Sequence, residues 1–173
     1  MRKRTVLVSL GVMAAIVAGS FIATAQGNER AFRATLTGYA EVPAVSTTGS
    51  GELRMSVNPG DTSLSYELQY RNLEGSTTTA AHVHLGQTGV SGGVSFFLCG
   101  GGGKPACPAT SGSVSGTVVA ADVIGPVGQG IAAMELDEIL KAMRSGVAYA
   151  NVHTNNHPTG EIRGQINDNS SEK

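Results

Sequence analysis

The chain has 173 residues, of which 12 are basic and 13 acidic, so its formal net charge at neutral pH is −1. The basic residues form no cluster beyond the first few positions. Nucleic acids and anionic membrane surfaces attract clustered positive charge, so we expect neither as a partner of this protein.

The N-terminal residues have the pattern of a secretory signal peptide. Met1-Arg2-Lys3-Arg4 is basic, an apolar run extends from Val6 to Ile22, and Ala23-Thr24-Ala25 matches a small-residue cleavage site. The alternative is an uncleaved membrane anchor, because the apolar run approaches the length of a membrane span. The cleavage site favours removal, and no cysteine lies beside it to carry a lipid anchor.

Export has consequences for size, charge and compartment. Removal of residues 1–25 takes away three of the 12 basic residues and none of the 13 acidic ones, which leaves 148 residues with a net charge of −4. That length suits one domain with one hydrophobic core, which we place at residues 30–167. We expect no membrane contact after cleavage, and a location that is periplasmic, at the cell surface or secreted.

Alternation of apolar and polar residues predicts strands through most of the remaining chain. Phe32–Leu36, Leu53–Val57 and Leu64–Tyr70 alternate, and the turn Asn58-Pro59-Gly60-Asp61 between the last two predicts a β-hairpin. Further strands are expected at Ala81–Leu85, Val94–Cys99, Ser113–Val119, Val147–His153 and Glu161–Ile166. Many short strands with glycine-rich turns indicate an all-β sandwich or barrel.

The two cysteines, Cys99 and Cys107, flank the glycine-rich stretch Gly100–Ala106. An oxidising compartment makes a disulfide the expected state, and closing so short a loop would stabilise the fold by about 2.5 kcal/mol in the chain-entropy model. The alternative is a pair of soft ligands for copper(I) or zinc. It is the weaker interpretation, because oxidation competes with thiolate ligation outside the cytoplasm.

One segment has helical instead of strand periodicity. Its apolar residues recur at the spacing of one helix face, with acidic residues at its start and basic residues near its end, as the helix dipole favours. We predict one short helix at 133–145 that covers an open end or edge of the sandwich, with the apolar face Leu136, Ile139, Leu140 and Met143. The polar residues 168–173 are expected to form a disordered tail.

All four histidines lie in two short stretches. The first is Ala81-His82-Val83-His84-Leu85-Gly86. In a strand, His82 and His84 share one face with Cα atoms about 6.5–7 Å apart, so both imidazoles can reach one metal ion. Ala81, Val83 and Leu85 then face the core.

The second stretch follows the same alternation. If Ala148, Ala150 and Val152 face the core, then Tyr149, Asn151 and His153 lie on the opposite face, with Glu161 and Arg163 beside them. We predict a metal site with these ligands: His82, His84, His153 and His157. Asn151, Glu161 and Arg163 are expected to orient the ligands. Imidazole ligands without sulfur favour copper(II) or zinc over calcium.

Other interpretations of these residues stay open. Histidines near strand ends also serve backbone groups or lie in solvent, and Glu161 with Arg163 would also fit a surface ion pair contributing under about 1 kcal/mol. No nucleophile elbow precedes a histidine, so we assign no catalytic residues. A hydrolase with Glu161 as general base at a histidine-bound metal is the weakest alternative.

Taken in order, three motifs resemble those of the CHRD domain, a module named for its repeats in chordin and also found in exported bacterial proteins. The resemblance extends from about Phe32 to Ile166. The opening motif is matched by Leu36-Thr37-Gly38-Tyr39-Ala40-Glu41-Val42-Pro43, the central motif by Ala81–Gly86, and the closing motif by Tyr149–Thr154 together with His157–Gln165.

The resemblance implies a Greek-key-like β-sandwich similar to that of copper/zinc superoxide dismutases, which also carry a His-x-His strand pair. It brings no match for their bridging histidine, and thus does not imply dismutase activity. The Cys99–Cys107 loop looks like an insertion of this member. Our first hypothesis is an exported metal-binding module. The others are a non-enzymatic domain that binds a protein or matrix partner without metal, and an enzyme of dismutase or hydrolytic type.

Overall fold

The computed structural model describes residues 30–168. The signal peptide predicted at residues 1–25, and residues 169–173 of the predicted tail, lie outside this range. Within it, no helix is long and apolar enough to cross a membrane. Residue 168, which we assigned to the tail, belongs to a short strand that pairs with the first strand of the sheet, with Asp168 opposite Phe32.

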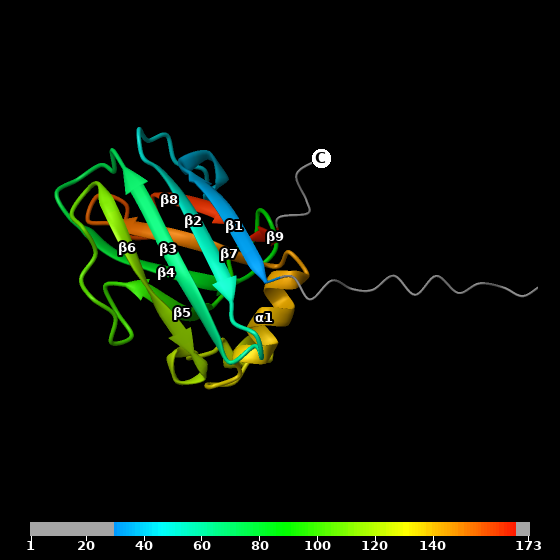
Figure 1. The fold of residues 1–173 in the computed structure, drawn as a ribbon. Helices are drawn as coiled ribbons and strands as arrows, with labels where there is room; N and C mark the ends of the chain where they lie inside the picture. Colours follow the sequence, from blue (N-terminus) through cyan, green and yellow to red (C-terminus); the bar gives the residue numbers. More distant parts are fainter. Residues whose placement is uncertain (1–29, 169–173) are drawn as a thin grey trace, which may run out of the picture.

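The regular structure of the described residues is mostly β-strand, with one α-helix (Figure 1). The all-β prediction is therefore confirmed, and each predicted strand overlaps an observed one. The strands are β1 (Ala31–Thr37), β2 (Ser50–Val57), β3 (Ser63–Arg71), β4 (Thr78–Leu85), β5 (Val94–Cys99), β6 (Gly112–Val119), β7 (Ala148–Thr154), β8 (Ile162–Gln165) and β9 (Asn167–Asp168).

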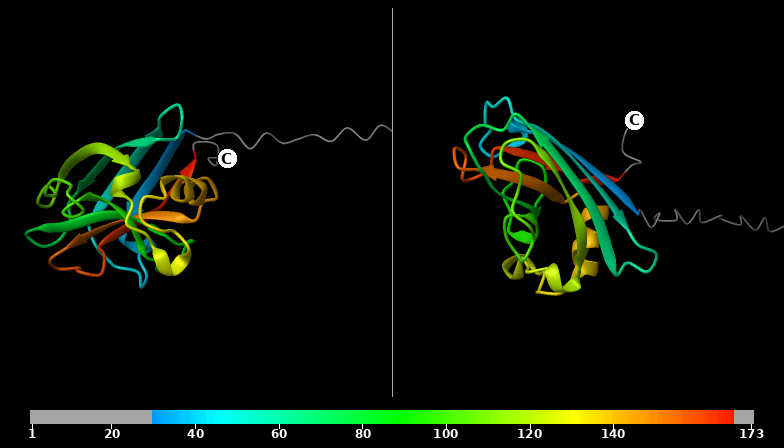
Figure 2. Two further views of the ribbon diagram at one scale, coloured as in Figure 1. Left: turned by 90° about the horizontal axis from the view of Figure 1, so that it is seen from below. Right: turned by 60° about the vertical axis from the view of Figure 1, so that its left-hand side comes forward.

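The strands form two layers that face each other across the core (Figures 1 and 2). The hydrogen-bonded order is β5-β4-β7-β8-β1-β2-β3-β6, and the paired strands are antiparallel. One layer is β1-β2-β3-β6 and the other is β5-β4-β7-β8. They are joined where β1 pairs with β8 and β9, and the path ends at β5 and β6. Since β6 lies beside β3 and β7 beside β4, the connections are of the Greek-key kind.

Alternation along the strands explains how the core forms. Side chains of successive strand residues point to opposite faces, so the apolar positions of each alternating run turn inward. The ten such residues of β1, β2 and β3 are all at most 4 % exposed. Two buried tyrosines of β3 add hydrogen bonds: Tyr66 donates to the Leu98 carbonyl of β5, in the other layer, at 2.7 Å, and Tyr70 donates to the Pro108 carbonyl of the β5–β6 connection at 2.5 Å.

The predicted helix is present as α1 (Leu136–Arg144). The four residues of its predicted apolar face are buried, and Figure 1 shows the helix across one end of the sandwich. On its outer face Lys141 pairs with Asp137 and Glu138, at 3.4 and 2.7 Å. Such exposed pairs add little, so burial of the apolar face is what fixes α1 in place.

Cys99 and Cys107 form the expected disulfide, with Cα atoms 5.1 Å apart. The glycine-rich loop that it closes packs around the ring of Phe97. A side-chain carbon at Gly101 would lie 2.4 Å from this ring, and one at Gly102 would lie 2.9 Å from it. Only glycine leaves room for the loop to approach Phe97 this closely.

Candidate metal centre

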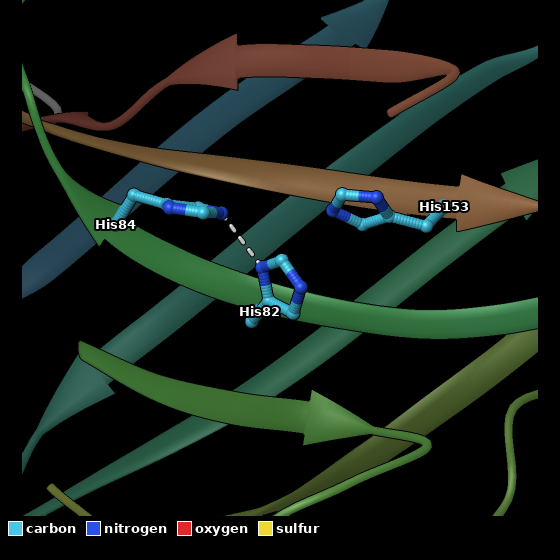
Figure 3. A group of neighbouring side chains, drawn as sticks. All are labelled: His82, His84 and His153. Atoms are coloured by element: carbon cyan, nitrogen blue, oxygen red, sulfur yellow. Dashed lines mark hydrogen bonds between the residues drawn. The ribbon is translucent and has the colours of Figure 1, made fainter. Parts of the chain in front are cut away.

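The two histidine stretches lie side by side, because β4 and β7 are neighbouring antiparallel strands. His84 is opposite Tyr149, His82 is opposite Asn151, and His153 is opposite Ala80. His82, His84 and His153 therefore project from the same face of this sheet (Figure 3). Ala81 and Val83 point into the core and are fully buried, as their alternation with the histidines predicts.

The three imidazoles form a compact cluster. One ring nitrogen from each of His82, His84 and His153 lies within 4.8 Å of the others. His82 Nδ1 and His84 Nε2 are hydrogen-bonded at 2.7 Å. The His82 ring centroid is 4.6 Å from that of His84 and 4.5 Å from that of His153. This arrangement can hold one metal ion.

Backbone carbonyls fix the protonation pattern of two of the rings. His84 Nδ1 lies 2.9 Å from the Gly92 carbonyl oxygen, and His153 Nδ1 lies 3.0 Å from that of Pro158. A carbonyl only accepts, so each Nδ1 carries the hydrogen and each Nε2 carries a lone pair. The Nε2 of His153 is buried and has no hydrogen-bond partner among the described residues. Metal-bound histidines are held by their second nitrogen in this same way.

Aromatic rings enclose the cluster. Tyr149 stacks on His84 with ring centroids 4.6 Å apart and planes 3° from parallel, and Phe97 meets His82 edge-on at 5.2 Å. The outward face of β4 is therefore not a solvent face. His82 and His84 are only 7 % and 8 % exposed, while His153 is half-buried.

Arg163 completes a stack above Tyr149. Its guanidinium carbon lies 3.4 Å from the centre of the Tyr149 ring. Its Nη2 donates to the carbonyls of Gln87 and Val90, at 3.1 and 2.8 Å. Arg163 thus holds the β4–β5 loop, which also contains Gly92, so it supports the carbonyl that orients His84.

Gly92 occupies a position where no side chain fits. A Cβ atom there would lie 1.6 Å from the Leu85 carbonyl oxygen. Its N–H donates to the Tyr149 hydroxyl at 3.1 Å, while its carbonyl accepts from His84. The tight approach of the loop to the end of β4 therefore depends on glycine.

Burial sets the charge of the cluster. Desolvation, together with smaller effects of the nearby His153 and His84, lowers the pKa of His82 to about 3. Desolvation lowers the pKa of His84 to about 4, against the opposing effect of the Gly92 carbonyl. Burial also lowers the pKa of His153. The rings are consequently neutral near pH 7, which is the form that binds metal.

His157, the fourth histidine predicted as a ligand, is not part of this cluster. It lies in the loop after β7, where its Nε2 is 3.4 Å from a carboxylate oxygen of Glu74. The loop carries the chain away from the face of β7 after Thr154. Strand alternation stops applying at that point, so it does not predict which way the side chain of His157 points.

The three residues predicted to orient the ligands have different surroundings. Arg163 acts through Tyr149 and the loop, as described above. Asn151 is on the same face as the histidines, but its amide donates to a carboxylate oxygen of Glu41. Burial raises the pKa of Glu41, which the Val42 N–H and the charge of Arg163 oppose.

Glu161 does not lie on the histidine face, where alternation from Arg163 had placed it. It precedes β8 and is fully buried. Its carboxylate accepts from Thr47 and Thr154 hydroxyls, at 2.6 and 2.7 Å, and from the Glu74 N–H at 2.7 Å. Three donors stabilise a buried carboxylate and tie two loops to β7. Neither the predicted surface ion pair with Arg163 nor a role as general base has support in these contacts.

Sequence reasoning missed the groups that hold the rings. Gly92 and Pro158 contribute main-chain oxygens, and every residue type has one, so their identity in the sequence does not predict this role. The sequence predicted Phe97 only as a residue of a strand, without its contact to His82. Tyr149 was placed on the correct face, and its stacking on His84 was open to prediction from their positions on neighbouring strands.

Together, the fold and the cluster define an all-β sandwich that carries three histidines on one face of two neighbouring strands. The chain belongs to the CHRD domain family, whose model matches residues 32–166. The matched region includes all of the strands except Ala31 of β1 and the short β9. No curated protein and no solved structure matches the chain.

Proposed function

We propose that this CHRD domain is an exported module that binds one transition-metal ion, copper or zinc, through His82, His84 and His153. The observation that carries the proposal is the buried Nε2 of His153. It has a lone pair, no partner among the described residues, and two other imidazoles beside it. An unsatisfied buried nitrogen is costly, and a bound metal would satisfy it.

The chemistry of the cluster supports a nitrogen-binding metal. The group contains three imidazoles and neither a carboxylate nor a thiol among the described residues. Calcium and magnesium require oxygen ligands, whereas neutral imidazole suits copper and zinc. The low pKa values of His82 and His84 keep both rings in the binding form without loss of a proton.

Export is supported by the N-terminal sequence pattern and by the disulfide. Met1–Arg4, the apolar run and Ala23-Thr24-Ala25 form the pattern of a cleaved signal peptide. The Cys99–Cys107 disulfide suits an oxidising compartment. We propose a periplasmic, surface or secreted location. If no metal binds, the alternative function is binding of an unidentified protein or matrix partner.

Calorimetric titration of the purified domain with copper(II) and with zinc tests the proposal. We expect one equivalent per chain with micromolar or tighter affinity, and loss of binding in the variant H82A/H84A. His157→Ala is the matched control, because it removes the one histidine outside the cluster and should leave binding unchanged. Absence of binding, or equal binding by wild type and H82A/H84A, would contradict the proposal.

A further inference from the structure

We infer that the outer face of the β1-β2-β3-β6 layer binds a short acidic oligosaccharide, in a polar groove that crosses these strands. The inference is independent of the proposed metal site, because the histidines project from β4 and β7, which belong to the other layer. Three features carry it: the shape of the groove, the chemistry of its lining, and an arginine in it that forms no ion pair.

The groove lies between two neighbouring rows of outward-facing side chains. Strand register gives the first row as Thr35, Glu52, Gln69 and Ser113. The second row is Thr37, Ser50 and Arg71, with Ser111 lining the same groove. Residues between the rows alternate to the core side, so their main chain forms the floor. The groove has a volume of about 650 Å³, within the range of about 300–1,000 Å³ that is typical of small-ligand sites.

The end of the groove beside β6 is held by hydrogen bonds. The Asn72 N–H donates to the Ser111 hydroxyl at 3.0 Å, and the Leu73 N–H donates to the Thr110 carbonyl at 3.0 Å. These bonds fix the segment that enters β6 against the end of β3. From β1 to β6 the groove crosses three strand spacings, or about 14 Å. It is therefore formed before a ligand binds, and it is longer than a single sugar ring.

The side chains that face the groove are polar and mostly carry hydroxyl groups. A hydroxyl both donates and accepts hydrogen bonds, which suits a ligand that itself has many hydroxyl groups. The larger apolar side chains of the lining, Leu36 and Tyr70, turn to the core and are at most 3 % exposed. The hydroxyl residues are Thr35, Thr37, Ser50, Ser111 and Ser113.

Arg71 gives the groove a positive charge that its neighbours do not balance. Its side chain is exposed, and it has no ion-pair partner among residues 30–168. Glu52 also lines the groove, but Arg54 binds both of its carboxylate oxygens, at 3.0 and 3.1 Å. A guanidinium pairs with a carboxylate through two parallel hydrogen bonds. The matching ligand is therefore a sugar that carries a carboxylate, which is a uronate.

Other classes of ligand match the groove less well. Nucleic acids require clustered cations, and the lining contains one arginine and no lysine. Peptides that bind to sheets add a strand at an edge or place side chains in apolar pockets. This groove crosses the middle of the layer, and polar side chains line it. An oligosaccharide of uronate units satisfies both the hydroxyl groups and Arg71.

Calorimetric titration of the purified protein with trisaccharides of galacturonate, glucuronate and mannuronate tests the inference, with a chelator present to keep the histidine cluster free of metal. We expect at least one of them to bind at one site per chain. Arg71→Ala should weaken this binding by at least about tenfold, because the charge-assisted pair is lost. Arg33→Ala is the matched control. It removes an exposed arginine of the same layer outside the groove, and should change the affinity by less than about twofold.

A second variant and a map of the contacts locate the ligand. Ser113→Tyr fills one end of the groove without a change of charge, and should also weaken binding. In nuclear magnetic resonance spectra, the amide signals of Thr35 and Ser50 should shift on titration, while those of His82 and His153 should not. Circular dichroism should show the same fold for wild type and variants, because the substituted side chains are exposed.

Three results would overturn the inference: no binding of any of these uronates, equal binding by wild type and Arg71→Ala, or equal affinity for the neutral trisaccharide of the same sugar and linkage. None of them bears on metal binding, which is measured on the histidines of the other layer. The two proposals therefore stand or fall separately.

Discussion

At the residue scale, main-chain oxygens orient His84 and His153 where many metal sites use carboxylates. Gly92 and Pro158 contribute these oxygens, and neither adds charge. The one charged group stacked near the cluster is Arg163, which acts across the Tyr149 ring. The cluster is thus a neutral ligand set, and its affinity for a metal depends on how easily the rings take up protons.

Acid should compete weakly with metal at this site. Burial lowers the pKa of His82 to about 3 and that of His84 to about 4, so both rings stay neutral well below their ordinary pKa. Between about pH 7.5 and 5.5, three exposed histidines would lose about a thousandfold in affinity, because each would protonate near pH 6.5. We expect a loss under about tenfold, measured by competition with a chelator of known affinity.

A loss near a thousandfold over that interval would show that the rings titrate at their ordinary pKa values. Titration of a short peptide with the sequence of residues 81–86 is the control, since its two histidines are exposed and should show the steep dependence.

Arg163 contacts none of the imidazoles directly, but it holds the Tyr149 ring and the β4–β5 loop, and this indirect support can be tested by substitution. Arg163→Lys keeps the charge, but loses the planar stack on Tyr149 and the geometry that reaches two carbonyls. We expect a destabilisation of about 1–3 kcal/mol, measured by urea unfolding. Arg54→Lys is the matched control, because Arg54 is exposed and pairs only with its neighbour Glu52. Equal effects of the two variants would contradict a special role for Arg163.

At the element scale, the strands followed directly from the sequence, and the site followed only in part. Alternation places His82 and His84 on one face of β4 and His153 on one face of β7. It does not say that β4 and β7 are neighbours. In the sequence, β5 and β6 separate β4 from β7. The two strands are neighbours only because β5 pairs on the other side of β4 and β6 pairs with β3, which is a long-range property of the whole sheet.

The loops were beyond prediction for a different reason. Gly92 and Pro158 act through their carbonyls, and Glu161 turns inward where β8 has not yet begun. Alternation holds only inside a regular strand, so residues one position outside it have no assigned face. The prediction of His157 as a ligand failed for the same reason, because it lies in a loop outside any strand.

The Cys99–Cys107 loop should stabilise both the fold and the ring of His82. Cys99→Ser with Cys107→Ser should lower the free energy of unfolding by about 2.5 kcal/mol, as the chain-entropy model gives for a loop of this length. Because the loop encloses Phe97, and Phe97 contacts His82, the same variant should bind copper(II) more weakly. Unfolding and calorimetry on wild type and variant measure both effects.

Reduced wild-type protein is the control for the double serine variant, since it opens the same loop without changing the residue types. Unchanged copper affinity in both would show that Phe97 holds its position without the loop, and would separate the site from the disulfide.

At the scale of the whole molecule, the candidate ligands come from one layer of the sandwich. β4 contributes two and β7 contributes one, so a bound ion would join two neighbouring strands. The other layer contributes none. Any stabilisation by metal therefore reaches the rest of the domain through the core between the layers, which includes Ala81, Val83, Ala150 and Val152.

Metal should raise the melting temperature of the entire domain in one transition. At a free metal concentration about 100 times the Kd, binding to the folded state adds about 2.7 kcal/mol, or roughly 5–10 °C for a domain of this size. Differential scanning calorimetry with and without copper(II) measures the shift. A separate early transition that does not respond to metal would show that the two layers unfold independently. H82A/H84A is the control and should show no shift.

Gly92 also determines how this site is to be traced in other chains. A search for acidic partners of the histidines would miss it, since the oxygen that orients His84 belongs to the main chain. The informative signature has two parts. The first is a His-x-His strand whose second histidine is followed eight residues later by a glycine, as His84 is by Gly92. The other is a histidine on the neighbouring strand that is followed five residues later by a proline, as His153 is by Pro158. Chains that keep the histidines but carry a larger residue at the glycine position should have lost the ring orientation, and with it the site.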